Sequence, residues 1–455
     1  MVYSITLTHA DQKELHGKLT GPQAFTWNIP GRTRRSFENS NPNLVLIFVA
    51  DEDWDPTAKG SKSREKISLR WLGATLSPLH QKSTSLDYRA HIKLVRPVPR
   101  PVVLADFSAI LRKHESENLG SAATDSFGIS QLGDDMGETM IGALGYLRPE
   151  MVELLEFLKT AVNADALDSS EPEDQAWREE RDAMRTILRI GQFSTALAGV
   201  WRRPVDRNEP YLAGLVRDPT ESSLMEHDTR FFDDWSTGRH PQMRCDIQVF
   251  TDGKRRLEIA NVNATKVEGR LGTDLIYYHH GTHSFTLVQY KKLGPRKQPM
   301  YVGPNDRLHG QLDRLEAVSK RSLSPSAARD WRLSNDHCFI KLAHWTEEDS
   351  AGDGAPASGM ILPVPYVRLL LEDSATATSG AGRQLGYEQV ERYLTNTQFI
   401  QLVQDGFIGS VGVDAQTLRE IVDERVEQGN GVMVAAEDSP ETPAERRRRN
   451  HSRGI

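Results

Sequence analysis

The chain has 455 residues and a formal net charge of −7. This length predicts two or three domains. A mean hydropathy of −0.52 and the absence of an apolar run long enough to span a bilayer exclude a helical membrane protein. Two cysteines, Cys245 and Cys338, are too few for a zinc knuckle or a disulfide framework. Because the N-terminus also lacks the features of a secretory signal, we expect a cytoplasmic protein with no membrane partner.

Residues 1–113 are predicted to form a β-rich domain. β-prone runs at 3–7, 44–49, 67–72 and 90–95 alternate with clusters of Gly, Pro, Asn and Asp. The run 44–49 is apolar throughout, which predicts a central strand covered on both faces. This block has 17 Lys and Arg against 10 Asp and Glu, a net charge of +7. A basic recognition domain that faces nucleic acid fits this charge, and so does an assembly domain with a solvated surface.

Residues 114–215 are predicted to form a helical connector. Residues 114–176 have 2 Lys and Arg against 14 Asp and Glu, a net charge of −12. Apolar residues at helical spacing predict helices near 149–158 and 177–190. The Gly-, Ser- and Asp-rich run 121–145 is expected to be a mobile loop, and the acidic run 164–174 a flexible link.

A third block, residues 216–436, opens with a helix-start pattern of Asp218 as N-cap, followed by proline and Glu221. Further strands are predicted at 245–250, 255–259, 337–343 and 360–371, with helices at 387–404 and 415–427. Residues 437–455 are low in apolar residues and are expected to be a disordered basic tail.

The most informative stretch of this block is residues 267–293, which predicts a β-hairpin. The two strands are residues 275–278 and 284–291, joined by a turn at 279–283 that contains Gly281. Period-two alternation places Gln289 and Lys291 on one face. Antiparallel pairing across the turn brings Asp274 close to both. A carboxylate, an amide oxygen and an ammonium group then meet at one end of a sheet.

At these residues the chain resembles the PD-(D/E)xK nuclease superfamily, in its Q-x-K variant. Residues 268–274 (EGRLGTD) match E-x-x-x-G-x-D, and residues 289–291 (QYK) match Q-x-K. Gln311 resembles the glutamine of the helix that often follows. The resemblance implies an α/β fold with a restriction-endonuclease-like core, in which helices flank a mixed sheet. It also implies a metal-dependent DNA endonuclease of prokaryotic antiviral defence or restriction.

The resemblance assigns a role to each residue of the proposed site. Asp274 binds Mg²⁺, for which Mn²⁺ can substitute, together with the carboxylate of Glu268 and the side-chain oxygen of Gln289. Lys291 positions or deprotonates the attacking water and stabilises charge on the phosphate. A carboxylate on the first helix, Glu221 or Asp228, is a further candidate ligand. The residues expected to contact nucleic acid are Lys292, Arg296, Lys297 and Gln311.

Several alternatives remain open. The hairpin can be a plain surface element whose lysines protect a sheet edge from aggregation. The protein can also keep the nuclease fold without cutting and bind nucleic acid or a partner defence protein. A third possibility is an effector that acts only after a partner or a small ligand docks. A homodimer is plausible because cutting both strands usually needs two sites. His279, His280 and His283 fit a polar turn better than a zinc site.

Overall fold

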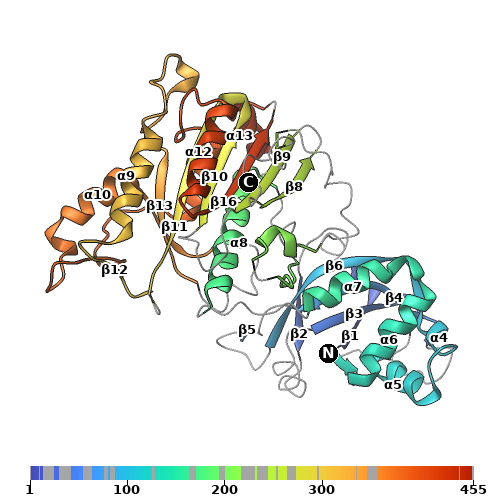
Figure 1. The fold of residues 1–455 in the computed structure, drawn as a ribbon. Coiled ribbons are helices and arrows are strands. Elements are labelled where there is room, and N and C mark those ends of the chain that lie inside the picture. The colour runs from blue at the N-terminus through green and yellow to red at the C-terminus, as the bar shows by residue number, and fades with distance from the viewer. Residues whose placement is uncertain are drawn as a thin grey trace. The chain divides into compact units, whose positions relative to one another are not determined.

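The computed structural model describes residues 2–9, 11–13, 25–29, 43–54, 64–75, 80–81, 88–124, 129–132, 134–162, 171–193, 200–206, 208–216, 231–232, 244–252, 255–263, 273–294, 297–334, 336–345, 356–439 and 441–452. The chain divides into two compact units (Figure 1). The N-terminal unit contains residues 1–165, 199–203 and 216–222, and the C-terminal unit contains residues 166–198, 204–215 and 223–455. Both are mixed α/β structures in which helices flank a mixed sheet.

The N-terminal unit is built on a seven-stranded mixed sheet. Its strands are β1 (Val2–Leu7), β2 (Phe25–Ile29), β3 (Asn43–Ala50), β4 (Ile67–Thr75), β5 (His80–Gln81), β6 (Tyr88–Val103) and β7 (Ile129–Leu132). The order across the sheet is β2-β6-β4-β3-β1-β7, and β5 pairs with β6. β1 is parallel to β3, and the other pairs are antiparallel.

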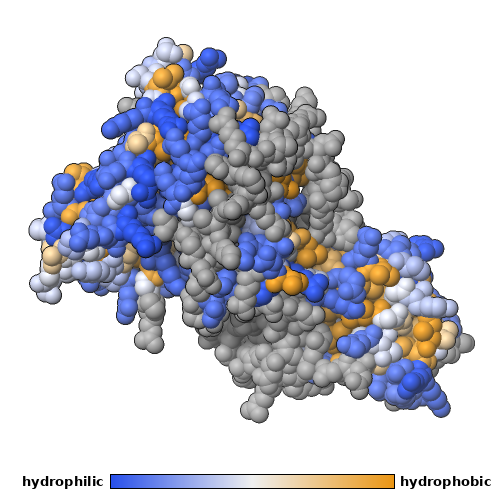
Figure 2. Space-filling view, in the orientation of Figure 1, coloured by the Kyte–Doolittle hydropathy of each residue, from blue (hydrophilic) through white to orange (hydrophobic). Residues whose placement is uncertain are grey.

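Strand β3 lies at the centre of this sheet and is buried on both faces, as its sequence predicts. Leu44, Leu46 and Phe48 pack with the helices of the unit, while Val45 and Ile47 point to the opposite face. The helices are α4 (Leu104–Phe107), α5 (Lys113–Thr124), α6 (Asp134–Leu147) and α7 (Val152–Val162), with the 3-10 turn η1 (Pro149–Met151) before α7. Figure 2 shows that apolar residues also reach the surface of this unit. One exposed apolar side chain is Val152 at the start of α7, which is 48 % exposed.

The expected boundary at residue 113 is wrong, because the helices that follow it complete the first unit. Leu119 on α5 and Leu144 on α6 are buried in the same core as β3. The run 121–145, expected to be a mobile loop, contains the end of α5, the edge strand β7 and most of α6. Residues 1–165, 199–203 and 216–222, which make up this unit, have 22 Lys and Arg against 22 Asp and Glu, a net charge of 0. The N-terminal unit is therefore not a basic module.

The C-terminal unit is built on a second seven-stranded mixed sheet. Its strands are β8 (Arg244–Asp252), β9 (Arg255–Asn263), β10 (Thr273–His279), β11 (Ser284–Lys292), β13 (Cys338–Ala343), β14 (Gly359–Pro363) and β16 (Gly431–Asp438). The order across the sheet is β14-β13-β11-β10-β16-β9-β8. β16 lies between the two hairpins, antiparallel to β9 and parallel to β10. A small separate sheet pairs β12 (Met300–Val302) with β15 (Arg383–Leu385).

Both hairpins that the sequence predicts in this unit are present, β8–β9 and β10–β11. The turn of β10–β11 is the 3-10 turn η6 (His280–Thr282), and it closes at His283 in the left-handed conformation, with φ 48°. After β11 the chain passes through α9 (Arg307–Ser319) and returns as β13, parallel to β11. A parallel pair needs such a crossover connection.

Helices cover both faces of this sheet (Figure 1). On one face, α9, α10 (Val364–Glu372) and α12 (Ala415–Glu427) form the core with β10, β11 and β13. α12 begins at the N-cap Asp414, whose side chain accepts a hydrogen bond from the backbone N–H of Thr417. On the other face lie α8 (Pro172–Ile190) and α11 (Asn396–Gln404), where Phe339 of β13 packs edge-on against Phe399 at 5.2 Å between ring centroids.

The α8 face of the sheet buries an ion pair that the sequence does not reveal. Lys341 of β13 donates to Asp182 of α8, and both side chains are at most 3 % exposed. Asp182 also accepts a hydrogen bond from the backbone N–H of Ala357. The charges are thus paired and hydrogen-bonded, which is the condition for burying them.

Three predicted elements of the C-terminal unit differ from the structure. The run 360–371 is only partly a strand, because β14 ends at Pro363 and α10 follows. Helix 387–404 is shorter than expected and begins at Asn396, capped by Thr395. The tail expected to be disordered contains the end of β16 and helix α13 (Pro443–Ser452), whose Arg446 forms a buried ion pair with Glu437. The helix predicted to begin at 218 lies outside the described residues except for 231–232.

The remaining short elements of the C-terminal unit are 3-10 turns, namely η3 (Tyr211–Gly214), η8 (Ala328–Asp330) and η10 (Ser374–Thr376). Among the helices of the described segments, none is both long and apolar enough to cross a membrane.

The packing of α9 on the sheet leads to a stability prediction. Leu312→Ala removes a fully buried side chain from the core, and we expect it to lower the free energy of unfolding of the C-terminal unit by about 2–5 kcal/mol. Leu369→Ala on α10, where the leucine is 63 % exposed, is the matched control and should change it by less than about 0.5 kcal/mol. The measurement is hydrogen exchange of the β11 amides at increasing urea concentration. Equal effects of the two changes would contradict the packing described.

Candidate functional site

The β10–β11 register brings Asp274 and Gln289 together. Their Cα atoms are direct partners in the antiparallel ladder, so their side chains point to the same face. Both side chains are fully buried. Lys291 lies two residues further along β11 on this face and is half-buried. The structure therefore places these three residues at one end of two central strands, on the face covered by α9 and α12.

The carboxylate of Asp274 is held by two side chains from another part of the chain. Arg425 Nε, at the end of α12, donates to Asp274 Oδ2 at 2.6 Å. Asn430 Nδ2, just before β16, donates to the same oxygen at 3.0 Å. The Arg425 side chain is 1 % exposed, so this ion pair is desolvated. Both partners of Asp274 were missed by the sequence analysis.

A signal for Arg425 does exist in the sequence. The core-facing positions of α12 are Leu418, Ile421, Val422 and Val426, at the spacing of one helix face. Arg425 falls on that face, where an apolar residue is expected. A charged residue at such a position requires a buried partner of opposite charge, and Asp274 is that partner.

Several buried polar atoms in this region of the unit have no hydrogen-bond partner among the residues that the structure describes. They are Asp274 Oδ1, Gln289 Oε1 and Nε2, Gln311 Oε1, Arg425 Nη2 and Asn430 Oδ1. Gln311 is 1 % exposed and lies on the face of α9 that packs on the sheet, so it belongs with this cluster and not with the exposed cations. Buried polar atoms in proteins are almost always hydrogen-bonded. The cluster is thus chemically suited to hold water, an ion or a polar ligand.

Charges from four elements act on Lys291. Burial lowers the pKa of its ammonium group, and the carboxylates of Glu179, Asp274 and Asp306 oppose that shift. Glu179 comes from α8 and Asp306 is the N-cap of α9. Arg314 on α9 also has a lowered pKa, first because of burial and then because of the Arg425 charge. Lys291, Arg314 and Arg425 thus place positive charge around the single carboxylate of Asp274.

A divalent cation such as Mg²⁺ needs oxygen ligands, and this cluster offers two of them. Asp274 Oδ1 and Gln289 Oε1 are neighbouring buried oxygens without partners, and oxygens of these types are ligands of Mg²⁺. These two atoms fit the ion, whereas the guanidinium on Oδ2 opposes it. Within the described segments no group of three or more His, Cys, Asp or Glu side chains could hold a metal. Glu268, Glu221 and Asp228, the expected further carboxylates, lie outside those segments.

The expected nucleic-acid contacts have different surroundings. Lys292 and Lys297 are exposed beyond the end of β11. Lys297 Nζ lies 5.6 Å from the ring centroid of Tyr387, and Tyr387 packs edge-on against Tyr393. Arg296 lies outside the described residues. Of the two exposed lysines, Lys297 thus adjoins an aromatic pair, while Lys292 directly follows Lys291 on β11.

Three other sets of polar side chains in this unit have structural roles: Ser410, the histidines of the β10–β11 turn, and Cys338. Ser410 fastens its loop to the hairpin, since its Oγ accepts a hydrogen bond from the Phe285 N–H at 2.9 Å. His279 and His283 contact the hydroxyl groups of Thr282 and Tyr278. Burial raises the pKa of the Cys338 thiol to about 12, so this cysteine is inert at neutral pH.

No family model, no curated protein and no solved structure matches this chain. A functional assignment therefore depends on the side chains of the C-terminal unit themselves.

The buried ion pair predicts strong coupling between Asp274 and Arg425. Arg425→Met leaves a buried carboxylate without its cation, and we expect a loss of about 3–5 kcal/mol in the free energy of unfolding of the C-terminal unit. The double variant Asp274→Leu/Arg425→Met should recover most of that loss, because neither charge is then buried alone. Hydrogen exchange of the β10 amides measures the free energy of unfolding of the single and the double variant. The control is Arg392→Met, which removes an arginine at an exposed position. A double variant whose free energy of unfolding is no higher than that of Arg425→Met would contradict the pairing.

The lowered pKa of Lys291 predicts a dependence of stability on pH. The folded state releases its proton at a lower pH than the unfolded chain, whose lysine pKa is about 10.4. Between the two pKa values the unfolded state binds more protons, so stability rises with pH. Lys291→Met should therefore stabilise the protein most at pH 7 and lose this advantage as the pH approaches 10. Thermal unfolding of both proteins across this range tests it, with Lys320→Met at an exposed position as control for loss of a surface charge.

Proposed function

We propose that the C-terminal unit is a metal-dependent endonuclease that hydrolyses phosphodiester bonds in DNA. The observation that supports this most directly is the pairing of Asp274 with Gln289 on adjacent central strands. It gives one carboxylate oxygen and one amide oxygen, both buried and without a hydrogen-bond partner in the described part of the chain. Lys291 follows on the same face. An acid, an amide and an amine at one sheet end are the groups that the Q-x-K pattern requires.

The residues of the cluster have separable roles in this proposal. Asp274 Oδ1 and Gln289 Oε1 would hold Mg²⁺, which supplies an activated water and neutralises charge on the phosphate. Lys291 orients the attacking water and stabilises negative charge that develops in the transition state. Arg314 and Arg425 add fixed positive charge that favours an anionic substrate in the same place. The exposed Lys292 and Lys297 contact the sugar–phosphate backbone.

The surrounding fold supports a restriction-endonuclease-like core. A mixed sheet is flanked by helices, the acid and the Q-x-K pattern occupy the two strands of one hairpin, and the next helix, α9, carries Gln311. A DNA substrate, a homodimer that cuts both strands and a role in prokaryotic antiviral defence belong to the same proposal. The N-terminal unit then serves recognition or assembly.

A second function is favoured by one specific contact. Arg425 Nε donates to Asp274 Oδ2 at 2.6 Å, so the protein's own cation occupies one of the two oxygens of the only described carboxylate in the strand pair. A protein that keeps this ion pair would bind nucleic acid or a partner without cutting it. An effector that becomes active when a ligand or partner disrupts the pair is a related possibility.

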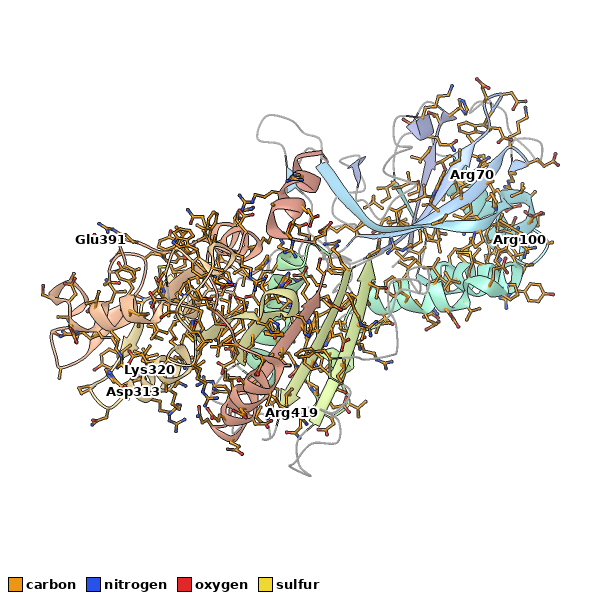
Figure 3. All side chains as sticks on the ribbon, turned by 90° about the horizontal axis from the view of Figure 1, so that it is seen from above. Arg70, Arg100, Asp313, Lys320, Glu391 and Arg419 are labelled. Atoms are coloured by element: carbon orange, nitrogen blue, oxygen red, sulfur yellow. The ribbon has the colours of Figure 1, made fainter. Side chains whose placement is uncertain are left out.

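Plasmid cleavage in Mg²⁺ distinguishes these functions. Asp274→Asn and Lys291→Met should each reduce the rate of cleavage at least 100-fold, since a metal ligand and a charge-stabilising group are removed. Asp274→Asn keeps the side-chain shape and a hydrogen-bond acceptor for Arg425. The matched controls are Glu391→Gln and Lys320→Met, which change exposed residues labelled in Figure 3 and should leave the rate unchanged.

Calorimetric titration with Mn²⁺ separates an inactive enzyme from a binding protein. Mn²⁺ binding that Asp274→Asn abolishes supports the nuclease. The absence of both cleavage and Mn²⁺ binding in the parent protein, with DNA binding retained, establishes the non-cutting function instead. Cleavage that persists in both Asp274→Asn and Lys291→Met would refute the assigned site.

A further inference from the structure

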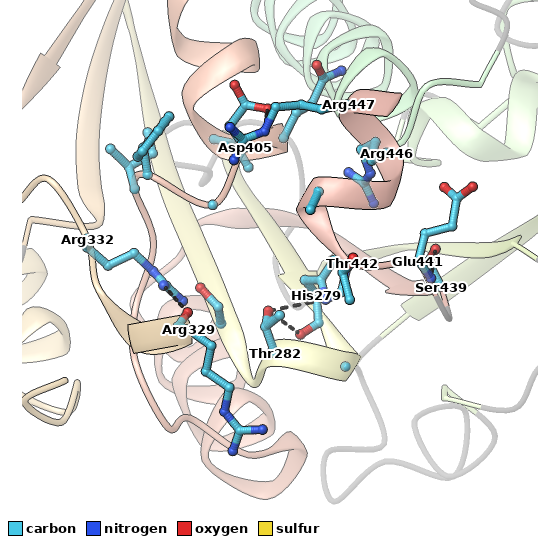
Figure 4. Close-up of a pocket in the computed structure, with 18 of the residues that line it drawn as sticks. His279, Thr282, Arg329, Arg332, Asp405, Ser439, Glu441, Thr442, Arg446 and Arg447 are labelled. Atoms are coloured by element: carbon cyan, nitrogen blue, oxygen red, sulfur yellow. Dashed lines mark hydrogen bonds and ion pairs between the residues drawn. The ribbon is translucent and has the colours of Figure 1, made fainter. Parts of the chain in front are cut away.

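The C-terminal unit contains a cavity with charged and aromatic side chains in its lining, at the opposite end of the β10–β11 hairpin from Asp274. It has a volume of about 640 Å³ and is formed by the hairpin turn, the segment 328–332, the segment 403–408 and the segment 439–447 (Figure 4). From Asp274 to His279, which lines the cavity, β10 rises roughly 17 Å. The cavity is thus separate from the cluster around Asp274.

Positive charge predominates in the lining. Arg329, Arg332, Arg446 and Arg447 line the cavity, whereas the carboxylates in the lining are Asp405 and Glu441. Three of the four arginines have a carboxylate partner: Arg329 lies 3.6 Å from Asp330, Arg447 lies 3.5 Å from Asp405, and Arg446 is paired with Glu437 below the surface. Figure 4 shows that Arg332, Arg446 and His279 belong to three separate segments around the cavity. The cavity therefore favours an anionic ligand.

Arg332 is the cation with the fewest anionic contacts in this group. Its Nη1 donates to the carbonyl oxygens of Arg329 and Trp331 at 3.2 and 3.0 Å, and its buried Nε has no partner among the described residues. The carbonyl oxygens hold the guanidinium in place but do not neutralise it, and the Asp330 charge opposes the lowering of its pKa by burial. This guanidinium is fixed in place and half-buried, and it still has an N–H donor available. It is therefore suited to a phosphate group, which accepts paired hydrogen bonds from arginine.

Arg446 provides a second donor on the far side of the cavity. Its side chain is 5 % exposed and lines the cavity, and its buried Nε has no partner within the described segments. Its position is fixed because Glu437 accepts hydrogen bonds from both Arg446 and the hydroxyl of Tyr277. Burial lowers the pKa of His279, so its imidazole is neutral at pH 7 and offers a polar contact without adding charge.

An aromatic surface adjoins these cations. Trp331 is 54 % exposed and meets Phe407 edge-on, with 6.3 Å between ring centroids. The guanidinium of Arg447 lies 5.7 Å from the centroid of Phe407. A backbone hydrogen bond of 2.8 Å from Leu333 N–H to the Phe407 carbonyl ties the two segments together. An exposed indole beside arginine side chains is a surface on which a base can stack.

We propose that this cavity binds a small phosphorylated ligand with an aromatic base, that is, a mononucleotide-class molecule. The phosphate contacts Arg332 and Arg446, and the base packs on Trp331. The volume lies within the range of sites for small organic ligands. This binding does not depend on the proposed nuclease, because it uses other residues and needs neither Mg²⁺ nor DNA.

Isothermal titration of the full chain with AMP, without Mg²⁺ or DNA, tests the proposal. AMP should bind at least tenfold more tightly than inorganic phosphate or adenosine alone, because each of these offers only one of the two contacts. Arg332→Gln should weaken AMP binding at least tenfold, and Arg332→Lys, which keeps the charge, should weaken it less. Trp331→Ala should weaken AMP binding at least fivefold while leaving the affinity for phosphate unchanged.

Matched controls change the same residue types elsewhere in the C-terminal unit. Arg392→Gln removes an exposed arginine, and Tyr301→Ala removes a 58 % exposed aromatic side chain, both outside the cavity. Each should alter AMP affinity less than twofold. The proposal is overturned by the absence of saturable AMP binding, by equal losses in Arg392→Gln and Arg332→Gln, or by a Trp331→Ala variant with full affinity. It is also overturned if a single-stranded oligonucleotide binds through Arg332 while AMP does not.

Discussion

The buried ion pair between Asp274 and Arg425 is the interaction on which the centre of the C-terminal unit depends. It joins a hairpin strand to the end of α12, and Asn430 adds a hydrogen bond to the same carboxylate oxygen from the residue that precedes β16. A carboxylate buried in a sheet is tolerated only when a cation and donors compensate for its lost hydration. The pair therefore constrains the end of α12 and the start of β16 against β10.

The same pair sets the chemical character of the cluster. With Arg425 on Oδ2, Asp274 presents one oxygen next to the amide of Gln289, and Lys291 and Arg314 add further positive charge nearby. Under the proposed function, a divalent cation and the guanidinium would compete for one carboxylate. The balance between them would then decide whether the cluster cuts a phosphodiester or only attracts one. This competition is why a conservative change at Asp274, which leaves Arg425 an acceptor, is more informative than a change to alanine.

The local sequence pattern predicted the two hairpins of the C-terminal unit, because the alternation of side chains and the turn residues act over only a few positions. The Asp274–Gln289 pairing follows from the turn at 279–283 and is the register found. The insertion of β16 between β9 and β10 could not be predicted, since it depends on contacts between residues about 160 positions apart. Arg425 and Asn430 were missed for the same reason. The helices after residue 113 were predicted to form a connector because their sequence is acidic and contains glycine. In the structure these helices have an apolar face that packs on the first sheet, and the sequence pattern did not indicate it.

The position of β16 also has a consequence for biosynthesis. In the described part of the sheet, the hairpin β8–β9 joins the other strands only through β16, so during translation it remains a separate two-stranded ribbon until residues 431–438 leave the ribosome. A two-stranded ribbon alone is only marginally stable in water. Arg425 and Asn430 emerge within the same short interval. A nascent chain that stops short of this point has neither the complete sheet nor a neutralised Asp274, so the cluster can form only after residues 425–438 have been translated.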